Sequence, residues 1–169
     1  MLISRKKFLL STFTISGAVF MPKIVMANDE ERLQIDTVLV KEFVGTAHRN
    51  MERVVEMHKT NPTLLNAAWD WGGGDFETAL GAASHVGYIE LVHYLIENGA
   101  QMNFLTLCLL GELDQVKNML AKYPFLINVK GPHGFTPLHH AINGGDNALP
   151  VKEYLESLGA KETKVPLQY

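Results

Sequence analysis

The sequence predicts an all-α solenoid of about four helix-turn-helix units, because short motifs recur along it at nearly one spacing. Thr78-Ala79-Leu80-Gly81-Ala82-Ala83 has the same frame as Thr136-Pro137-Leu138-His139-His140-Ala141, 58 residues later. Leu80 corresponds to Leu138 and Ala83 to Ala141. An apolar segment and a Gly-Ala pair follow each copy, and the two pairs, at Gly99 and Gly159, are 60 residues apart.

A second series of motifs alternates with the first. Residues 62–66, Pro-Thr-Leu-Leu-Asn, are echoed by residues 124–128, Pro-Phe-Leu-Ile-Asn, 62 residues later. Two interleaved series at one spacing indicate four units of alternating type. The apolar content of 47% and charged content of 20% are typical of a globular protein rather than a disordered one.

The segment at residues 134–141 has the features of a helix start. Thr136 offers the hydroxyl that an N-cap requires, and Pro137 follows at the first helical position, where its missing N–H costs nothing. Leu138 and Ala141 are three residues apart and therefore share one helix face. Thr136-Pro137-Leu138-His139 followed by Ala141 resembles the signature of the ankyrin repeat.

The resemblance covers about residues 38–160. It implies that the His139 position bonds to backbone at a neighbouring turn, and that partners are bound by loop tips and by exposed positions of the inner helices. We expect a polar lead-in at 28–37, repeats at about 38–68, 76–103, 104–131 and 134–160, and a C-terminal tail at 161–169. The Thr-Pro-Leu-His core is absent from the first and third repeats.

Apolar periodicity supports each unit. Leu39, Val40, Phe43, Val44 and Ala47 form a stripe at helical spacing, and the following helix should stop before Asn61-Pro62. Residues 104–110 are almost wholly apolar, as an inner helix buried on both sides requires. Gly99 should supply a left-handed helix end. The second helix of each unit repeats one apolar pattern, centred on Val54, Val92, Val116 and Val151.

Residues 69–76 contain both tryptophans and three consecutive glycines, so we expect a loop. In one interpretation Trp69 or Trp71 folds back to cover the first helix pair. In another the loop is an aromatic finger that binds a partner. A phosphate-binding loop is disfavoured, because neither a following Gly-Lys-Ser/Thr nor a Gly-x-Gly-x-x-Gly spacing is present.

The N-terminus resembles an export signal. A basic stretch, Ser4-Arg5-Lys6-Lys7, precedes the apolar residues 8–21, and Val25-Met26-Ala27 is a small-residue cleavage site. The stretch also resembles the twin-arginine signal, from which it departs at Lys6. We expect a signal peptide at 1–27 and a periplasmic or secreted protein. The choice between export routes, and between cleavage and retention as an anchor, stays open.

Charge and cysteine content exclude some classes of function. Removing the four basic residues of the leader leaves 11 Lys and Arg against 18 Asp and Glu, a formal charge of −7. Such a body would be repelled by phosphate backbones, so nucleic acid is not expected as a ligand. The apolar leader is too short and polar for a stable membrane span. The single cysteine, Cys108, lies in an apolar segment where a thiol is usually inert.

No local spacing predicts catalysis, a cofactor or a metal. The seven histidines include no His-x-x-x-His or His-Glu-x-x-His pair, and Cys-x-x-Cys is impossible with one cysteine. His85 and His93 belong to different expected helices, and His139 and His140 should point to different faces. The sequence therefore predicts no catalytic, cofactor-binding or metal-binding residues.

We expect a monomeric, non-catalytic, exported module that binds another protein. The candidate contacts are Trp71 and Phe76 in the first loop, His133 and Phe135 in the last, and His85, His140 and Asn143 on the inner helices. The alternatives are a small metal-binding protein or enzyme using His85, His133 and His140, and an accessory protein that protects or matures an exported enzyme.

Overall fold

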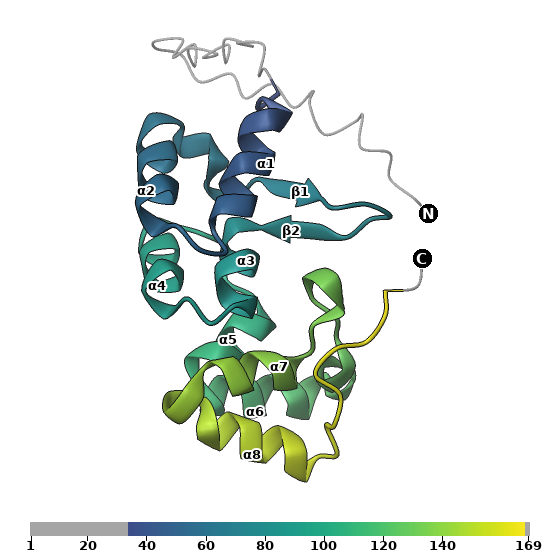
Figure 1. Ribbon diagram of the computed structural model, residues 1–169. Coiled ribbons are helices and arrows are strands. Elements are labelled where there is room, and N and C mark those ends of the chain that lie inside the picture. The colour runs from purple at the N-terminus through teal and green to yellow at the C-terminus, as the bar shows by residue number, and fades with distance from the viewer. Residues whose placement is uncertain (1–33, 168–169) are drawn as a thin grey trace, which may run out of the picture. The chain divides into compact units, whose positions relative to one another are not determined.

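The computed structural model describes residues 34–167, in which eight α-helices form four consecutive pairs (Figure 1). The pairs are α1 (Thr37–Thr46) with α2 (Met51–Thr60), α3 (Ala79–His85) with α4 (Ile89–Glu97), α5 (Phe104–Leu110) with α6 (Leu113–Lys122), and α7 (Pro137–Asn143) with α8 (Leu149–Ser157). The inner helices α1, α3, α5 and α7 pack each on the next. The predicted helical repeat architecture is confirmed for this part of the chain.

Side-chain caps begin three of the inner helices, including the cap that the sequence predicted at Thr136. Thr78 accepts a hydrogen bond from the Gly81 N–H at 3.1 Å, and Asn103 accepts one from the Thr106 N–H at 3.0 Å. Thr136 accepts one from the His139 N–H at 3.3 Å, with Pro137 in the first turn of α7. Each cap satisfies a backbone donor that the first turn of a helix leaves free.

The second motif series also forms one repeated local structure. Residues Pro62–Asn66 and Pro124–Asn128 are both short 3-10 helices, η2 and η3, which follow α2 and α6. Helix α2 ends at Thr60, as expected ahead of Asn61-Pro62. Gly99, after α4, has the predicted left-handed backbone, with φ of +97°.

Two apolar cores lie between the inner and outer helices. One lies mainly in the first two repeats, with Leu109 of α5 added, and contains Phe43, Leu64 and Leu91; the other lies within the last two and contains Phe104 and Leu155. The four valines that recur in the second helices, Val54, Val92, Val116 and Val151, are fully buried. This burial explains the repeated pattern, because one helix pair cannot cover its apolar face alone.

The expectation of an irregular loop at residues 69–76 was wrong, because the segment forms a β-hairpin. Strand β1 (Ala68–Asp70) pairs antiparallel with β2 (Phe76–Thr78), with Trp69 opposite Glu77. The three glycines occupy only the tip, where all three have positive φ. The hairpin projects on the side away from α2 and α4 (Figure 1). Trp69 packs back against the first core, whereas Trp71 lies beyond the strands.

The segment after α8 returns to the start of α7. The Val165 N–H donates to the Gly134 carbonyl at 2.9 Å, and the Thr136 hydroxyl donates to the Glu162 carbonyl at 2.6 Å. A Cβ at Gly134 would clash with the backbone oxygen of Val165, so this approach requires glycine. Residues 161–165 therefore pack against the fourth repeat.

The predicted signal peptide, residues 1–27, lies outside the described residues. Among residues 34–167, no helix has the length and hydropathy that a membrane span requires.

Candidate functional site

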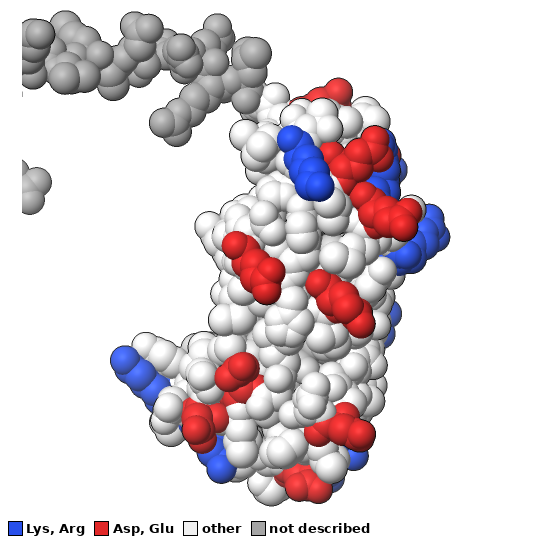
Figure 2. Space-filling model, turned by 90° about the vertical axis from the view of Figure 1, so that its left-hand side faces the viewer, with Lys and Arg blue, Asp and Glu red and all other residues white. Residues whose placement is uncertain are grey.

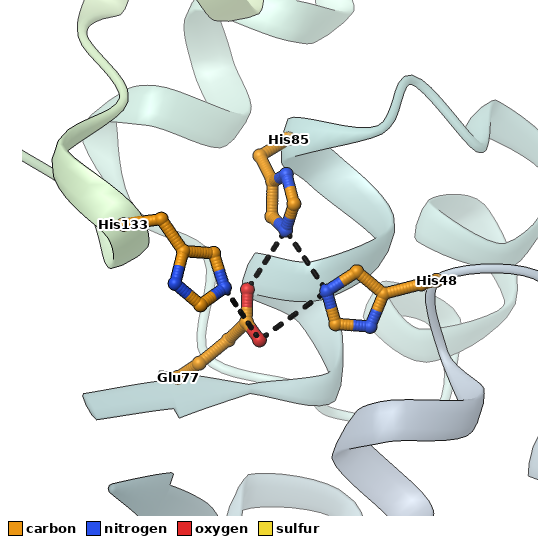
Figure 3. Close-up of side chains that lie close together, drawn as sticks. All are labelled: His48, Glu77, His85 and His133. Carbon is orange, nitrogen blue, oxygen red and sulfur yellow. Dashed lines mark hydrogen bonds and ion pairs between the residues drawn. The ribbon is translucent and has the colours of Figure 1, made fainter. Parts of the chain in front are cut away.

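Four polar side chains from separate parts of the chain meet at the base of the hairpin. His48 lies in the turn after α1, Glu77 in β2, His85 at the end of α3, and His133 in the short 3-10 turn η4 (Pro132–Gly134). One nitrogen or oxygen atom from each lies within 4.8 Å of all the others. Figure 3 shows the three imidazole rings pointing their edges at the Glu77 carboxylate.

Glu77 is the centre of this histidine–glutamate cluster, which we define as His48, Glu77, His85 and His133. Its side chain is 0% exposed. Oε2 accepts a hydrogen bond from the indole N–H of Trp71 at 2.7 Å and lies 3.4 Å from His48 Nε2 and 3.5 Å from His133 Nε2. Oε1 lies 2.9 Å from His85 Nε2 without hydrogen-bonding geometry, and is therefore a buried oxygen with no donor.

The alternation of side chains along strand β2 explains why a glutamate is buried here. Successive strand residues point to opposite faces, so Phe76 is 63% exposed while Glu77 is 1% exposed. The following residue, Thr78, caps α3. The strand thus directs a carboxylate inward immediately beside a helix that ends in His85.

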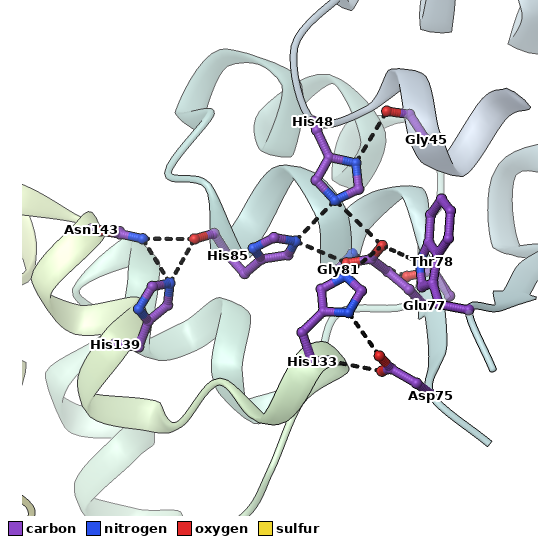
Figure 4. A network of polar contacts seen from close by, with 11 residues as sticks. Gly45, His48, Asp75, Glu77, Thr78, Gly81, His85, His133, His139 and Asn143 are labelled. Atoms are coloured by element: carbon purple, nitrogen blue, oxygen red, sulfur yellow. Dashed lines mark hydrogen bonds and ion pairs between the residues drawn. The ribbon is translucent and has the colours of Figure 1, made fainter. Parts of the chain in front are cut away.

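Two of the rings are oriented by groups that can only accept hydrogen bonds. His48 Nδ1 lies 3.1 Å from the Gly45 carbonyl oxygen, and His133 Nδ1 lies 2.7 Å from Asp75 Oδ2 (Figure 4). Since neither acceptor carries a hydrogen, both Nδ1 atoms must carry the proton and donate. In the neutral imidazole, Nε2 then has a lone pair directed at the cluster.

Asp75 also holds the backbone that carries His133. Its Oδ1 accepts the His133 backbone N–H at 2.8 Å. His133 has φ of +58°, and no other non-glycine residue in the range 34–167 has a positive φ. Such a conformation typically costs about 1 kcal/mol or more and persists where surrounding contacts determine it. The two bonds from Asp75 fix this turn against the hairpin.

The main chain of His85 is held from α7. The His139 Nε2–H donates to the His85 carbonyl at 2.8 Å, and Asn143 Nδ2 donates to the same oxygen at 2.6 Å. The backbone bond implied for His139 is therefore confirmed, with its acceptor at the end of α3. Burial lowers the pKa of His139. The Phe135 ring stacks on both His85 and His139, at centroid distances of 4.9 Å and 4.0 Å.

The structure separates the residues that were predicted to form one exposed surface. His85 and His133 enter the cluster, but His140 does not: it is 1% exposed, and its Nδ1 donates to the Thr136 carbonyl at 2.9 Å. Burial lowers the pKa of His140 to about 4. The expected exposure of His85 and His140 was wrong, because the α3 and α7 helices pack these faces against neighbouring elements.

The remaining candidates differ in their freedom to contact a partner. The Asn143 side chain donates to the His85 carbonyl, and the Phe135 ring is stacked between the rings of His85 and His139. Trp71 is 38% exposed but donates to Glu77. Phe76 alone among the seven predicted contacts presents most of its surface, at 63%.

Sequence reasoning missed His48, Glu77 and Asp75. Along the chain, 29 positions separate His48 from Glu77, 8 separate Glu77 from His85, and 48 separate His85 from His133. No local motif therefore joins them. The signal that could have indicated Glu77 is the alternation Phe-Glu-Thr ahead of α3, once residues 76–78 are taken as a strand.

Three imidazole nitrogens and a carboxylate oxygen are a ligand set for a transition metal. The four cluster residues include no hydroxyl or thiol nucleophile. Cys108, the single cysteine, belongs to the second core, and burial raises the pKa of its thiol to about 12. A thiol with so high a pKa stays protonated and is a poor nucleophile.

These helix pairs with a projecting hairpin define a helical repeat protein. Residues 75–107 match the family model described as Ankyrin repeat, a range that spans β2, α3 and α4 and enters α5. This match identifies residues 75–107 as an ankyrin repeat. Ankyrin repeats generally mediate protein–protein interaction. No curated protein matches the chain.

Proposed function

We propose that this chain is a monomeric, non-catalytic, exported module that binds a protein partner with the hairpin β1–β2 and the adjoining outward face of α1. The observation that carries the proposal is an exposed aromatic side chain at the end of an anchored hairpin. Phe76 is 63% exposed, while its neighbour Glu77 is buried in the cluster and held by Trp71. An aromatic side chain on a fixed backbone contributes contact area at low entropic cost.

An open groove on α1 extends this surface. Apolar and charged side chains line it together, among them Val38, Lys41, Glu42, Arg49 and Trp71. Val38 is 69% exposed. A mixed lining of this kind suits the rim and core of a protein interface, where apolar anchors are surrounded by charges. The hairpin and the groove meet at Trp71, so one partner can contact both.

Surface charge favours a protein over a polyanion. Figure 2 shows the face that carries α2 and α4, where carboxylates are spread along the length and Lys and Arg lie mainly at the two ends. The formal charge that remains after removal of the leader, −7, is also negative. Phosphate-rich ligands would be repelled by a protein with this net charge.

Export is the second part of the proposal and rests on the leader sequence. The basic residues 5–7, the apolar residues 8–21 and the small-residue site at 25–27 are the parts of an export signal. The mature protein should begin at Asn28 and be recovered from the periplasmic fraction. Arg5→Ala should leave the precursor unexported, and this defect should be more severe if the twin-arginine route is used. N-terminal sequencing that begins at Met1 would refute cleavage.

Capture of a partner from the periplasmic fraction tests the surface. Phe76→Ala should weaken capture by about 30-fold, the effect of losing an anchor worth about 2 kcal/mol. Phe125→Ala is the matched control, because Phe125 is 70% exposed and lies on η3, outside the proposed surface. Loss of capture in Phe125→Ala with full capture in Phe76→Ala would place the interface elsewhere.

A further inference from the structure

We propose that His48, Glu77, His85 and His133 bind one late first-row divalent cation, with Zn²⁺ as the best match, and that the ion fastens the hairpin to the turns around it. This inference goes beyond the proposed partner binding and does not depend on it. It rests on the spacing of the four ligand atoms, on the tautomers of the histidines, and on the buried oxygen that has no donor.

The ligand atoms lie close enough together to share one ion. Bonds of about 2.1 Å in a tetrahedral zinc site place neighbouring ligand atoms about 3.4 Å apart. Glu77 Oε1 lies 2.9 Å from His85 Nε2, whereas Glu77 Oε2 lies 3.4 Å from His48 Nε2 and 3.5 Å from His133 Nε2. His48 Nε2 and His85 Nε2 are 3.1 Å apart. All four ligand atoms lie within 4.8 Å of one another, so modest side-chain adjustments would bring three nitrogens and one Glu77 oxygen to the spacing of a tetrahedron.

The fixed tautomers leave lone pairs that face one another. His48 and His133 donate from Nδ1, so their neutral rings direct unprotonated Nε2 atoms at the Glu77 carboxylate, which also only accepts. Acceptors facing acceptors in a buried site are unfavourable unless a donor or a cation lies between them, and His85 Nε2, 3.1 Å from His48 Nε2, can donate to only one of them at a time. In metal sites, histidines typically donate their second ring N–H to a carbonyl or a carboxylate. Gly45 and Asp75 supply those two acceptors here.

The balance of charge also favours a bound divalent cation. The carboxylates of Glu77 and Asp75 are 0% and 13% exposed, and neutral histidines cannot offset them. A divalent cation would neutralise both charges. Glu77 Oε2 is occupied by the Trp71 N–H, which leaves Oε1, without a donor, as the free ligand oxygen. Doubly protonated His48 and His133 would also balance the charge, and the experiment below distinguishes the two.

The ligand set indicates a structural ion. Four protein ligands complete a tetrahedral zinc site, whereas catalytic sites keep a position open for water or substrate. The ligands come from the turn after α1, from β2, from the end of α3 and from η4, which belong to the first repeat, the second repeat and the turn ahead of the fourth repeat. One ion would thus join the first two repeats to the turn ahead of the fourth, beneath the hairpin that carries Trp71 and Phe76.

Titration with Co²⁺ and Zn²⁺ tests this proposal, using protein purified without a histidine tag and stripped with chelator. We expect one ion per chain, visible d–d absorption of tetrahedral Co²⁺ that Zn²⁺ abolishes, and a melting temperature that rises with Zn²⁺ and falls with chelator. His48→Gln and His133→Asn should abolish the absorption; asparagine is chosen because it tolerates the positive φ at this position. Asp75→Asn, which removes a positioning charge, should weaken binding about 10- to 100-fold.

His93→Ala is the control, because His93 is exposed on α4 and belongs to no cluster. It should leave the Co²⁺ spectrum and stoichiometry unchanged. Absence of stoichiometric binding by the unaltered protein would overturn the proposal, as would tetrahedral binding that survives both His48→Gln and His133→Asn. Stabilisation that appears only on acidification, with no response to metal, would assign the cluster to protonated histidines instead. Circular dichroism confirms that each variant is folded.

Discussion

Replacing Leu138 by alanine tests the packing of the fourth repeat. Leu138 is 4% exposed and lies in the second core with Phe104, Cys108 and Leu155. Burial of a leucine contributes about 1.5–3 kcal/mol, and the cavity left by truncation adds to the loss. Leu138→Ala should therefore lower the free energy of unfolding by about 2–5 kcal/mol. Urea unfolding followed by circular dichroism measures this as a lower midpoint at an unchanged slope.

Ile142→Ala is the matched control on the same helix. Ile142 has the same number of carbon atoms as Leu138 and lies one turn later, but it is 43% exposed. Alanine also has the higher helix propensity, so this substitution should change stability by no more than about 0.5 kcal/mol. Equal losses in the two variants, or no loss in Leu138→Ala, would refute the packing described for α7.

Three further predictions follow from polar and titratable groups. Thr136→Ala should cost about 1 kcal/mol through loss of the α7 cap, whereas Thr136→Ser should retain most of that stability in the same urea assay. His140 has its pKa lowered from 6.5 to about 4, so the unfolded chain takes up a proton there before the folded chain does. The free energy of unfolding should consequently fall by about 3 kcal/mol as the pH decreases from 6.5 to 4. Comparison with His140→Gln isolates this contribution, and an identical pH dependence in both proteins would disprove it. Cys108, with its thiol pKa raised to about 12, should resist a thiol reagent at pH 8 until denaturant is added; rapid labelling of the native protein would show that the second core is open.

Local chemistry in the sequence determined the helical repeats. The caps Thr78, Asn103 and Thr136, the breaker Pro62 and the left-handed Gly99 act within one turn of the backbone, so their effects are visible in a few consecutive residues. The buried valines recur because each outer helix faces the same kind of neighbour. The backbone bond made by His139 was implied by the resemblance to the ankyrin repeat.

Only the tertiary structure decided the hairpin and the histidine–glutamate cluster. Three glycines in a row gave no sign that the residues on either side would pair, since pairing depends on contacts across the turn and on packing against α1. The cluster ligands come from positions 48, 77, 85 and 133, and no spacing rule links residues that meet through the stacking of separate repeats. The same stacking buried His85 and His140, which the repeat pattern alone had placed on an exposed face.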